Sequence, residues 1–155
     1  GHGIDFGATS HYSPTNDAEV LTTYEEGTWT PQPMFGGANS NMAVTVGGYY
    51  VRVGKQVTAW YQLIFTNTGT SSGTFQIGGF PFSNSLTEWT NPGWGYFHRF
   101  DFAEGDDHLV TCNLSGTTST WRVAQYGAGT NMAAVTQANL SNSTHVAGSL
   151  VYRCT

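Results

Sequence analysis

The sequence predicts an all-β fold, an antiparallel and jelly-roll-like β-sandwich, and three observations support this. Aromatic residues make up 14% of the chain, and Gly, Ser, Thr and Asn fill much of the remainder, a composition typical of β-rich proteins with many turns. Apolar and polar residues alternate with a period of two in short runs, whereas no helical period of 3.6 persists. Clusters of Gly, Asn, Ser and Pro separate these runs. At 155 residues the chain fits one domain with a core of its own.

The alternating runs predict the strands in chain order. They are expected at residues 28–32, 42–53, 56–67, 74–77, 95–102, 108–114, 118–126 and 146–153. Short strands bounded by turn residues are typical of a sandwich or jelly roll. The N-terminal residues lack a sustained pattern, so residues 1–23 are expected to form an extended lead-in and residues 24–155 the sandwich domain.

The strand QVTAWYQLIFT, at 56–66, carries bulky apolar residues on both faces. One face presents Val57, Ala59, Tyr61, Leu63 and Phe65, and the other presents Thr58, Trp60, Gln62 and Ile64. A strand with one face in water should alternate cleanly, so the face with Trp60 and Ile64 is expected to be covered as well. A second copy of the chain is the simplest covering, and a long loop that folds back is the alternative.

Charge and hydropathy exclude several classes of function. Five Lys and Arg against ten Asp and Glu give a net charge of −5, without the basic stripe that a nucleic-acid site requires. No run of about eighteen apolar residues is present, so membrane insertion is not expected. The Gly pairs do not open helices, and no cofactor is expected. Cys112 and Cys154 lack metal-site spacing and are expected to be buried free thiols.

Two adjacent glutamates stand out in YEEGTWTP, at 24–31, because only 10% of the residues are charged. A glycoside hydrolase needs two carboxylates about 5 to 9.5 Å apart across a sugar, whereas neighbours on a strand point to opposite faces. Glu25 and Glu26 are therefore expected to be a solvated, polar entrance to the first strand and not a catalytic pair. Trp29, which follows them, is expected to enter the core or a subunit contact.

The densest polar segment is HRFDFAEGDDHL, at 98–109. Its carboxylates would suit calcium, and His98 and His108 on flanking strands would suit a transition metal near a three-fold axis. These histidines, with Asp106 and Asp107, are the metal candidates, but Glu-Gly-Asp-Asp is also ordinary turn chemistry, so no metal is expected. No GxSxG motif is present, so an enzyme is not expected.

A tryptophan-rich stretch, LTEWTNPGWGYFHR at 86–99, is the candidate receptor-binding site. Pro-Gly turns hold a segment at the surface, and aromatic rings beside Asn, Glu and Arg suit stacking on the apolar face of a sugar. The alternative is that the rings cap the sandwich. The candidate contact residues are Trp89, Asn91, Trp94, Tyr96 and Arg99.

Several segments occur in a recognisable order along the chain. They are GIDF at 3–6, YEEGTWTP at 24–31, GGYYVRVGKQVTAW at 47–60, IGGFPF at 77–82 and SLVYR at 149–153. In this order they resemble the C-terminal head domain of tailed-bacteriophage tail fibres and tailspikes. The resemblance covers residues 3–82 and then only the last strand. Phe80, at a usual Leu position, and the aromatic insert at 89–102 depart from the family pattern.

The resemblance implies a homotrimeric β-sandwich knob at the distal tip of a tail fibre, assembled in the host cytoplasm. Such a knob attaches the virion to a bacterial surface glycan or protein, and residues 1–23 would lead in from the fibre shaft. With the two-faced strand, it assigns Trp29, Trp60 and Ile64 to the trimer interface. The alternative function is a trimerisation or capping domain of a fibre or depolymerase tailspike that has no receptor site of its own.

Overall fold

The computed structural model describes the backbone of residues 4–5, 20–21, 23–83, 94–100, 109–114, 121–126 and 133–154, and the side chains of residues 23–83 and 134–154. Strands dominate this part of the chain, and their pairings are antiparallel. The predicted all-β, antiparallel fold is therefore confirmed. Within these residues, no helix is long and apolar enough to cross a membrane.

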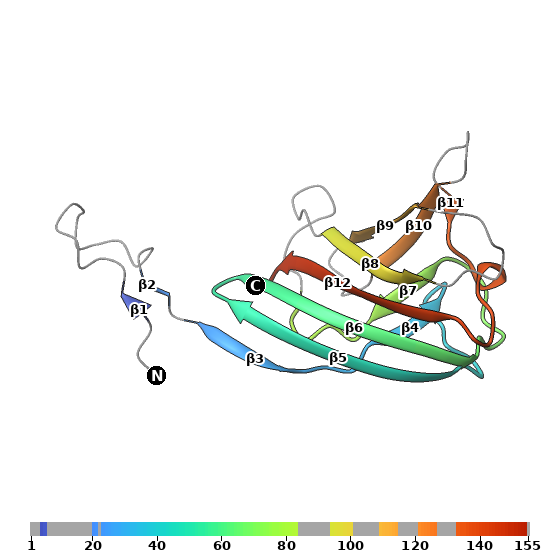
Figure 1. Ribbon diagram of the computed structural model, residues 1–155, viewed down its shortest axis with the longest axis horizontal. Coiled ribbons are helices and arrows are strands. Elements are labelled where there is room, and N and C mark those ends of the chain that lie inside the picture. Colours follow the sequence, from blue (N-terminus) through green and yellow to red (C-terminus); the bar gives the residue numbers. More distant parts are fainter. Residues whose placement is uncertain are drawn as a thin grey trace.

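Two five-stranded sheets form the layers of a sandwich (Figure 1). The first, called here the β6 sheet, contains in spatial order β3 (Tyr24–Thr28), β5 (Ala43–Val53), β6 (Gln56–Asn67), β12 (His145–Arg153) and β8 (Trp94–Phe100). The second, the β7 sheet, contains β4 (Gln32–Phe35), β7 (Phe75–Gly78), β10 (Trp121–Tyr126) and β11 (Ala133–Ala134), with β9 (Leu109–Leu114) paired to β10. Strands β1 (Ile4–Asp5) and β2 (Val20–Leu21) pair with each other, and η2 (Gln137–Asn139) is a single 3-10 turn.

Most predicted strands are present, and one prediction is wrong. β6 has the predicted bounds, and β5 and β12 each differ from them by one residue. The strand predicted at 28–32 does not form, because residues 29–31 carry the chain from β3 in one sheet to β4 in the other. Pro31 has no N–H to donate to a ladder, and Trp29 turns into the core.

The core lies between the sheets and is built from alternate residues of each strand. The predicted inner face of β6 is confirmed: its buried residues are Val57, Ala59, Tyr61, Leu63 and Phe65. The β7 sheet contributes Phe35, Phe75 and Ile77, which are also buried. The Phe75 ring lies 5.4 Å from that of Phe35 and 6.1 Å from that of Phe65, centroid to centroid, so aromatic contacts join the two layers. Cys154 is a buried free thiol at the edge of this core, as predicted.

Trp29 is held against Gly48 where the chain leaves the β6 sheet. Its backbone N–H donates to the Gly48 carbonyl at 3.1 Å, and its indole Nε1 donates to the Trp60 carbonyl at 3.0 Å. Its ring stacks on Phe80 with 5.4 Å between centroids. A Cβ on Gly48 would lie 2.6 Å from the Trp29 Nε1 and 2.7 Å from its carbonyl oxygen. Only glycine therefore leaves room for the indole at this position.

A second aromatic cluster ties the last strand to the segment after β7. The Tyr152 hydroxyl donates to the Phe82 carbonyl at 3.1 Å and accepts from the Phe82 N–H at 3.3 Å. The Phe80 ring lies 5.5 Å from that of Tyr152, and the Tyr50 ring meets Phe82 edge-on at 5.2 Å. Burial raises the pKa of Tyr152, so the phenol stays protonated and keeps donating. Segments far apart in sequence thus converge on one cluster.

Substituting Gly48 by Ala should lower the free energy of unfolding by about 1 to 3 kcal/mol, because a methyl group there overpacks against Trp29. Gly47 is the matched control, since a Cβ at Gly47 meets nothing within 4 Å. Gly47→Ala should be neutral or slightly stabilising, because glycine is unfavourable within a strand. Urea unfolding of the two variants measures the difference. Equal destabilisation by both substitutions would show that the contact with Trp29 does not restrict position 48 to glycine.

Candidate functional site

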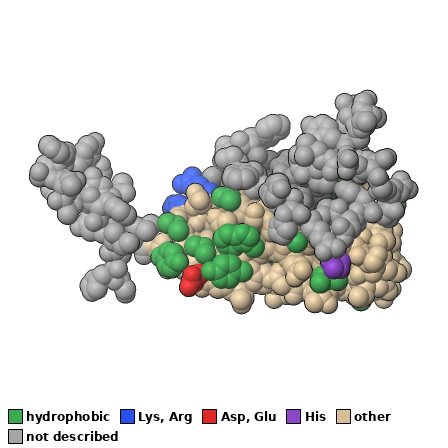
Figure 2. Space-filling view, in the orientation of Figure 1, with side chains coloured by type: hydrophobic (Ala, Val, Ile, Leu, Met, Phe, Trp, Pro, Cys, Tyr) green, Lys and Arg blue, Asp and Glu red, His purple; other side chains and the backbone are tan. Residues whose placement is uncertain are grey.

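The outer face of the β6 sheet exposes large hydrophobic side chains, shown gathered in Figure 2. The aromatic patch, as it is called here, consists of Tyr24, Tyr49, Val53 and Trp60, with exposed fractions of 65%, 43%, 43% and 39%. Tyr24 pairs with Val53 across β3 and β5, and Tyr49 pairs with Trp60 across β5 and β6. Directly opposite residues share a face of a sheet. The patch is therefore a surface set by strand register.

The patch is ordered by hydrogen bonds as well as by ring contact. The Tyr49 and Trp60 rings lie 5.5 Å apart with 32° between their planes. Both the Tyr24 hydroxyl, at 3.1 Å, and the Tyr49 hydroxyl, at 3.3 Å, donate to the Glu26 Oε2. One carboxylate thus holds two rings of the patch in position. A partner that packs on the patch would therefore contact rings whose hydroxyl groups already donate to the Glu26 carboxylate.

Glu25 and Glu26 point to different sides of β3. The Glu25 Oε1 accepts from the Tyr50 hydroxyl at 2.7 Å, and Tyr50 belongs to the buried core. Glu26 instead faces the patch. The expected extended segment is present, so the two carboxylates do not face each other across a common space. Both are exposed, as predicted, but each also positions tyrosines, which the interpretation as solvated charges missed.

The two carboxylates change the acidity of the tyrosines beside them. The hydrogen bond to Glu26, and then its charge, raise the pKa of Tyr24. Burial and then the Glu26 charge raise the pKa of Tyr49, and the hydrogen bond to Glu25 raises that of Tyr50. In each case the neutral phenol is the favoured form, because a phenolate beside a carboxylate would be repelled.

The candidate receptor residues that the structure describes lie in β8, at the opposite edge of the same sheet from β3. Trp94, Tyr96 and Arg99 occupy register positions opposite Val151, Ser149 and Ala147 of β12. Trp94 was expected in a loop, whereas it is the first residue of a strand, because pairing with β12 extends that far. Ser149 in turn pairs with Trp60, so one row across the sheet runs from Tyr49 through Trp60 and Ser149 to Tyr96. Trp89 and Asn91 lie outside the described residues.

The residues predicted at a trimer interface separate into two environments. Trp29 is 8% exposed and packs within its own chain, which confirms the core alternative and leaves little of it for a subunit contact. Trp60 lies in the aromatic patch, and Ile64 is half-buried beside His145 of β12. Of the metal candidates, His98 lies in β8, whereas Asp106, Asp107 and His108 lie outside the described part of the chain. The described residues contain no cluster of metal-binding side chains.

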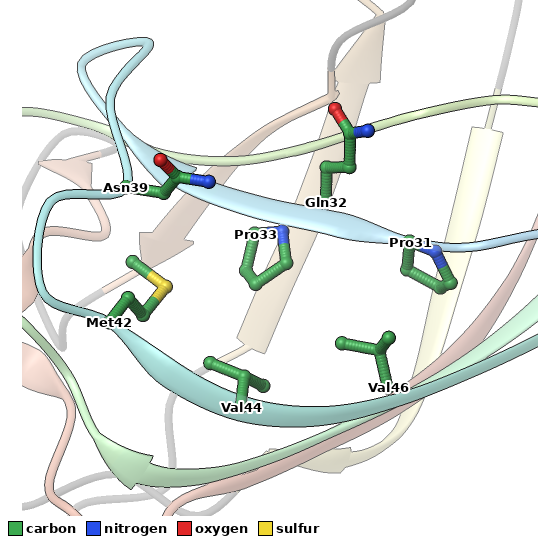
Figure 3. Close-up of a pocket in the computed structure, with 7 residues that line it drawn as sticks. All are labelled: Pro31, Gln32, Pro33, Asn39, Met42, Val44 and Val46. Atoms are coloured by element: carbon green, nitrogen blue, oxygen red, sulfur yellow. The ribbon is translucent and has the colours of Figure 1, made fainter.

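Sequence reasoning missed a groove at the edge of the sandwich. The edge groove has a volume of about 170 Å³ and is lined by Pro31, Gln32, Pro33, Asn39, Met42, Val44 and Val46. Figure 3 shows Val44 and Val46 of β5 pointing toward the segment that carries Pro31 and Pro33. All seven lining residues lie within residues 31–46, and the groove forms where the segment with β4 folds back beside the start of β5, which the alternation of residues does not predict. The lining is apolar except for one Gln and one Asn.

Replacing Glu26 by Gln should lower the pKa of Tyr24 and, to a smaller extent, that of Tyr49, whose pKa is raised first by burial. Tyr50 should not respond, because it contacts Glu25. Glu25→Gln is the matched control and should lower the pKa of Tyr50 alone. An NMR titration of ring-labelled tyrosines in alkaline solution resolves each residue. A uniform response of the three tyrosines to either substitution would contradict the separate pairing.

This architecture is similar to part of one known protein structure. No family model matches the chain, and no curated protein matches it significantly. Among solved structures, the fold is similar to that of Dettilon tailspike protein (gp208), with a TM-score of 0.62 and 14% sequence identity. The likeness covers 84% of this chain but 24% of the tailspike chain, so the chain spans about a quarter of that protein's length. The β-sandwich described above is therefore a fold that also occurs within a tailspike.

Proposed function

We propose that this chain is a head domain of a bacteriophage tail fibre or tailspike, at the distal tip, which attaches the virion to a bacterial surface glycan or protein. The observation that carries the proposal is the likeness of fold to a tailspike over 84% of the chain. The domain acts by binding, without catalysis of its own. Glu25 and Glu26, the carboxylate pair in YEEGTWTP, agree with this assignment because they point apart and hold tyrosines.

The packing of the motif segments supports the same proposal. YEEGTWTP contributes Trp29, which contacts both Gly48 of GGYYVRVG and Phe80 of IGGFPF. The last strand joins them through Tyr152. Four of the five segments that carry the resemblance to fibre heads, all but GIDF, are therefore joined by contacts into one packing unit. That unit is a scaffold, and the resemblance in sequence does not extend to the aromatic stretch at 89–99.

Receptor binding is assigned to this stretch. Trp94, Tyr96 and Arg99 all belong to β8, an edge strand of the β6 sheet. Aromatic and guanidinium groups in one strand suit stacking on a sugar ring and hydrogen bonding to its hydroxyls. Trp89 and Asn91 precede them in sequence and complete the proposed contact set.

The second candidate is an assembly domain that trimerises or caps a fibre or depolymerase spike. The exposed aromatic patch favours it, because exposed clusters of large apolar side chains mark interaction surfaces. Both functions share one feature, which we also propose: a homotrimer that buries the outer face of the β6 sheet, including Trp60 and Ile64. A ligand-binding assay on this fragment separates the two functions.

Light scattering of the purified chain should give the mass of a trimer, because closed three-fold symmetry buries the patch without open-ended assembly. Trp60→Glu should yield monomers, since it places a charge in the contact. A native mass near 16.7 kDa, that of one chain, would contradict the homotrimer.

A labelled form of the chain should bind cells of a susceptible strain in a panel of bacteria, and glycan arrays then identify a sugar ligand. Trp94→Ala should weaken this binding at least tenfold, about 1.4 kcal/mol, while the trimer mass and melting temperature stay unchanged. Those two measurements are the control for folding. Absence of binding to every strain, with the trimer intact, would favour the assembly domain, and release of reducing sugar ends from host polysaccharide would instead identify an enzyme.

A further inference from the structure

One half of β5 has no neighbouring strand on its outer edge. β3 pairs with the other half, from Val53 to Tyr49, and the Trp29 N–H adds a last bond to the Gly48 carbonyl. Residues 43–47 pair with β6, and within the described part of the chain no strand pairs with them on the opposite side. Backbone groups alternate in direction along a strand, so the N–H and C=O groups of Val44 and Val46 point to the same open side as the Gly48 carbonyl.

The surroundings of this open edge are free of charge. No Asp, Glu, Lys, Arg or His occurs anywhere from residue 31 to residue 51, and the edge groove lies directly beside the unpaired stretch. Exposed edge strands usually carry charged side chains that prevent pairing with other chains. An uncharged edge with an apolar groove indicates a surface that is covered in the assembled protein.

The aromatic patch requires the kind of apolar contact that the edge groove can supply. It presents the Trp60 and Tyr49 rings from the face of the sheet, and the Tyr24 and Tyr49 hydroxyls already donate to Glu26. A partner therefore needs to supply apolar contact and no acceptor for these hydroxyls. The groove supplies such contact through prolines, valines and a methionine. Its volume of about 170 Å³ is several times the roughly 30 Å³ share of one water molecule in the liquid.

We infer that the aromatic patch of one copy packs into the edge groove of the next copy, with Trp60 as the inserted ring. This inference rests on the proposed homotrimer and names the surface that Trp60 meets. A ring about a three-fold axis is built from heterologous contacts between two different surfaces, whereas a patch that meets itself gives a two-fold dimer. The patch lies on the face of the β6 sheet and the groove at its edge. A heterologous contact gives a closed ring only when its rotation closes, so the homotrimer requires each contact to turn the next copy through one third of a full turn.

A mixing experiment tests the heterologous contact. Trp60→Glu breaks the patch and leaves the groove, and Val46→Glu blocks the groove and leaves the patch. Each variant alone should be a monomer of 16.7 kDa. An equimolar mixture should form a heterodimer that contains one of each chain, because the intact patch of one variant fits the intact groove of the other. Light scattering over a concentration series and native mass spectrometry measure both states.

Two control chains accompany these variants. A chain with both substitutions should stay monomeric alone and with either single variant, and Ala138→Glu, at an exposed site in η2, should assemble like the wild type. Val46 is half-buried, so Gln32→Glu, at an exposed residue of the same groove, replaces Val46→Glu if circular dichroism shows that the latter is unfolded.

The outcomes separate this inference from the proposed function. A wild-type monomer would overturn the homotrimer and the inference together. A wild-type trimer whose two variants are monomeric alone and do not combine would overturn the heterologous contact and leave the homotrimer standing. Assembly by Trp60→Glu with loss of glycan binding would assign the patch to a saccharide and would also overturn the inference.

Discussion

The contact between the Trp29 indole and Gly48 is the constraint on which the rest of the structure depends. The indole occupies the space of an absent side chain on β5 and donates to the Trp60 carbonyl on β6. It thereby fixes the point at which the chain leaves one sheet for the other. Because β3 ends there, the remaining half of β5 has no neighbour on that side within the described residues, and the edge groove opens beside it. The same contact that orders the core thus creates an outer surface.

The sequence predicts the regular parts of this fold better than the places where segments meet. The alternation along Gln56–Asn67 determines both the bounds of β6 and its buried face. Trp29 and Trp60 look alike in sequence, yet one is buried and the other 39% exposed. Their difference depends on Gly48, nineteen positions away from Trp29 in sequence, and on a register that no local pattern reveals. For the same reason the groove was missed, whereas the alternation along β6 correctly separated Trp60 from the buried face of that strand.

The two roles proposed for the β6 sheet fall on different strands. Tyr49 and Trp60, which belong to the proposed contact between copies, lie on β5 and β6, and Trp94 and Tyr96, proposed for recognition, lie on β8 beyond β12. Ser149 and Val151 of β12, which have short side chains, lie between the two groups in the strand register. In the proposed homotrimer, the sheet between them would hold each ligand site at a fixed position relative to the three-fold axis. Several copies would then present their sites with constant spacing, which favours multivalent attachment.

The position of β12 has a consequence for how the protein is made. This strand follows the other strands of the β6 sheet in sequence, yet it lies inside that sheet, paired along its whole length with β6 and on its other side with β8. During synthesis β3, β5 and β6 leave the ribosome first, but β8 has no partner in that sheet until residue 153 has been translated. The long sequence separation of these pairings also makes their formation slow. Loss of β12 therefore removes the centre of a sheet, and the open edge of β6 that is then exposed is a site for aggregation.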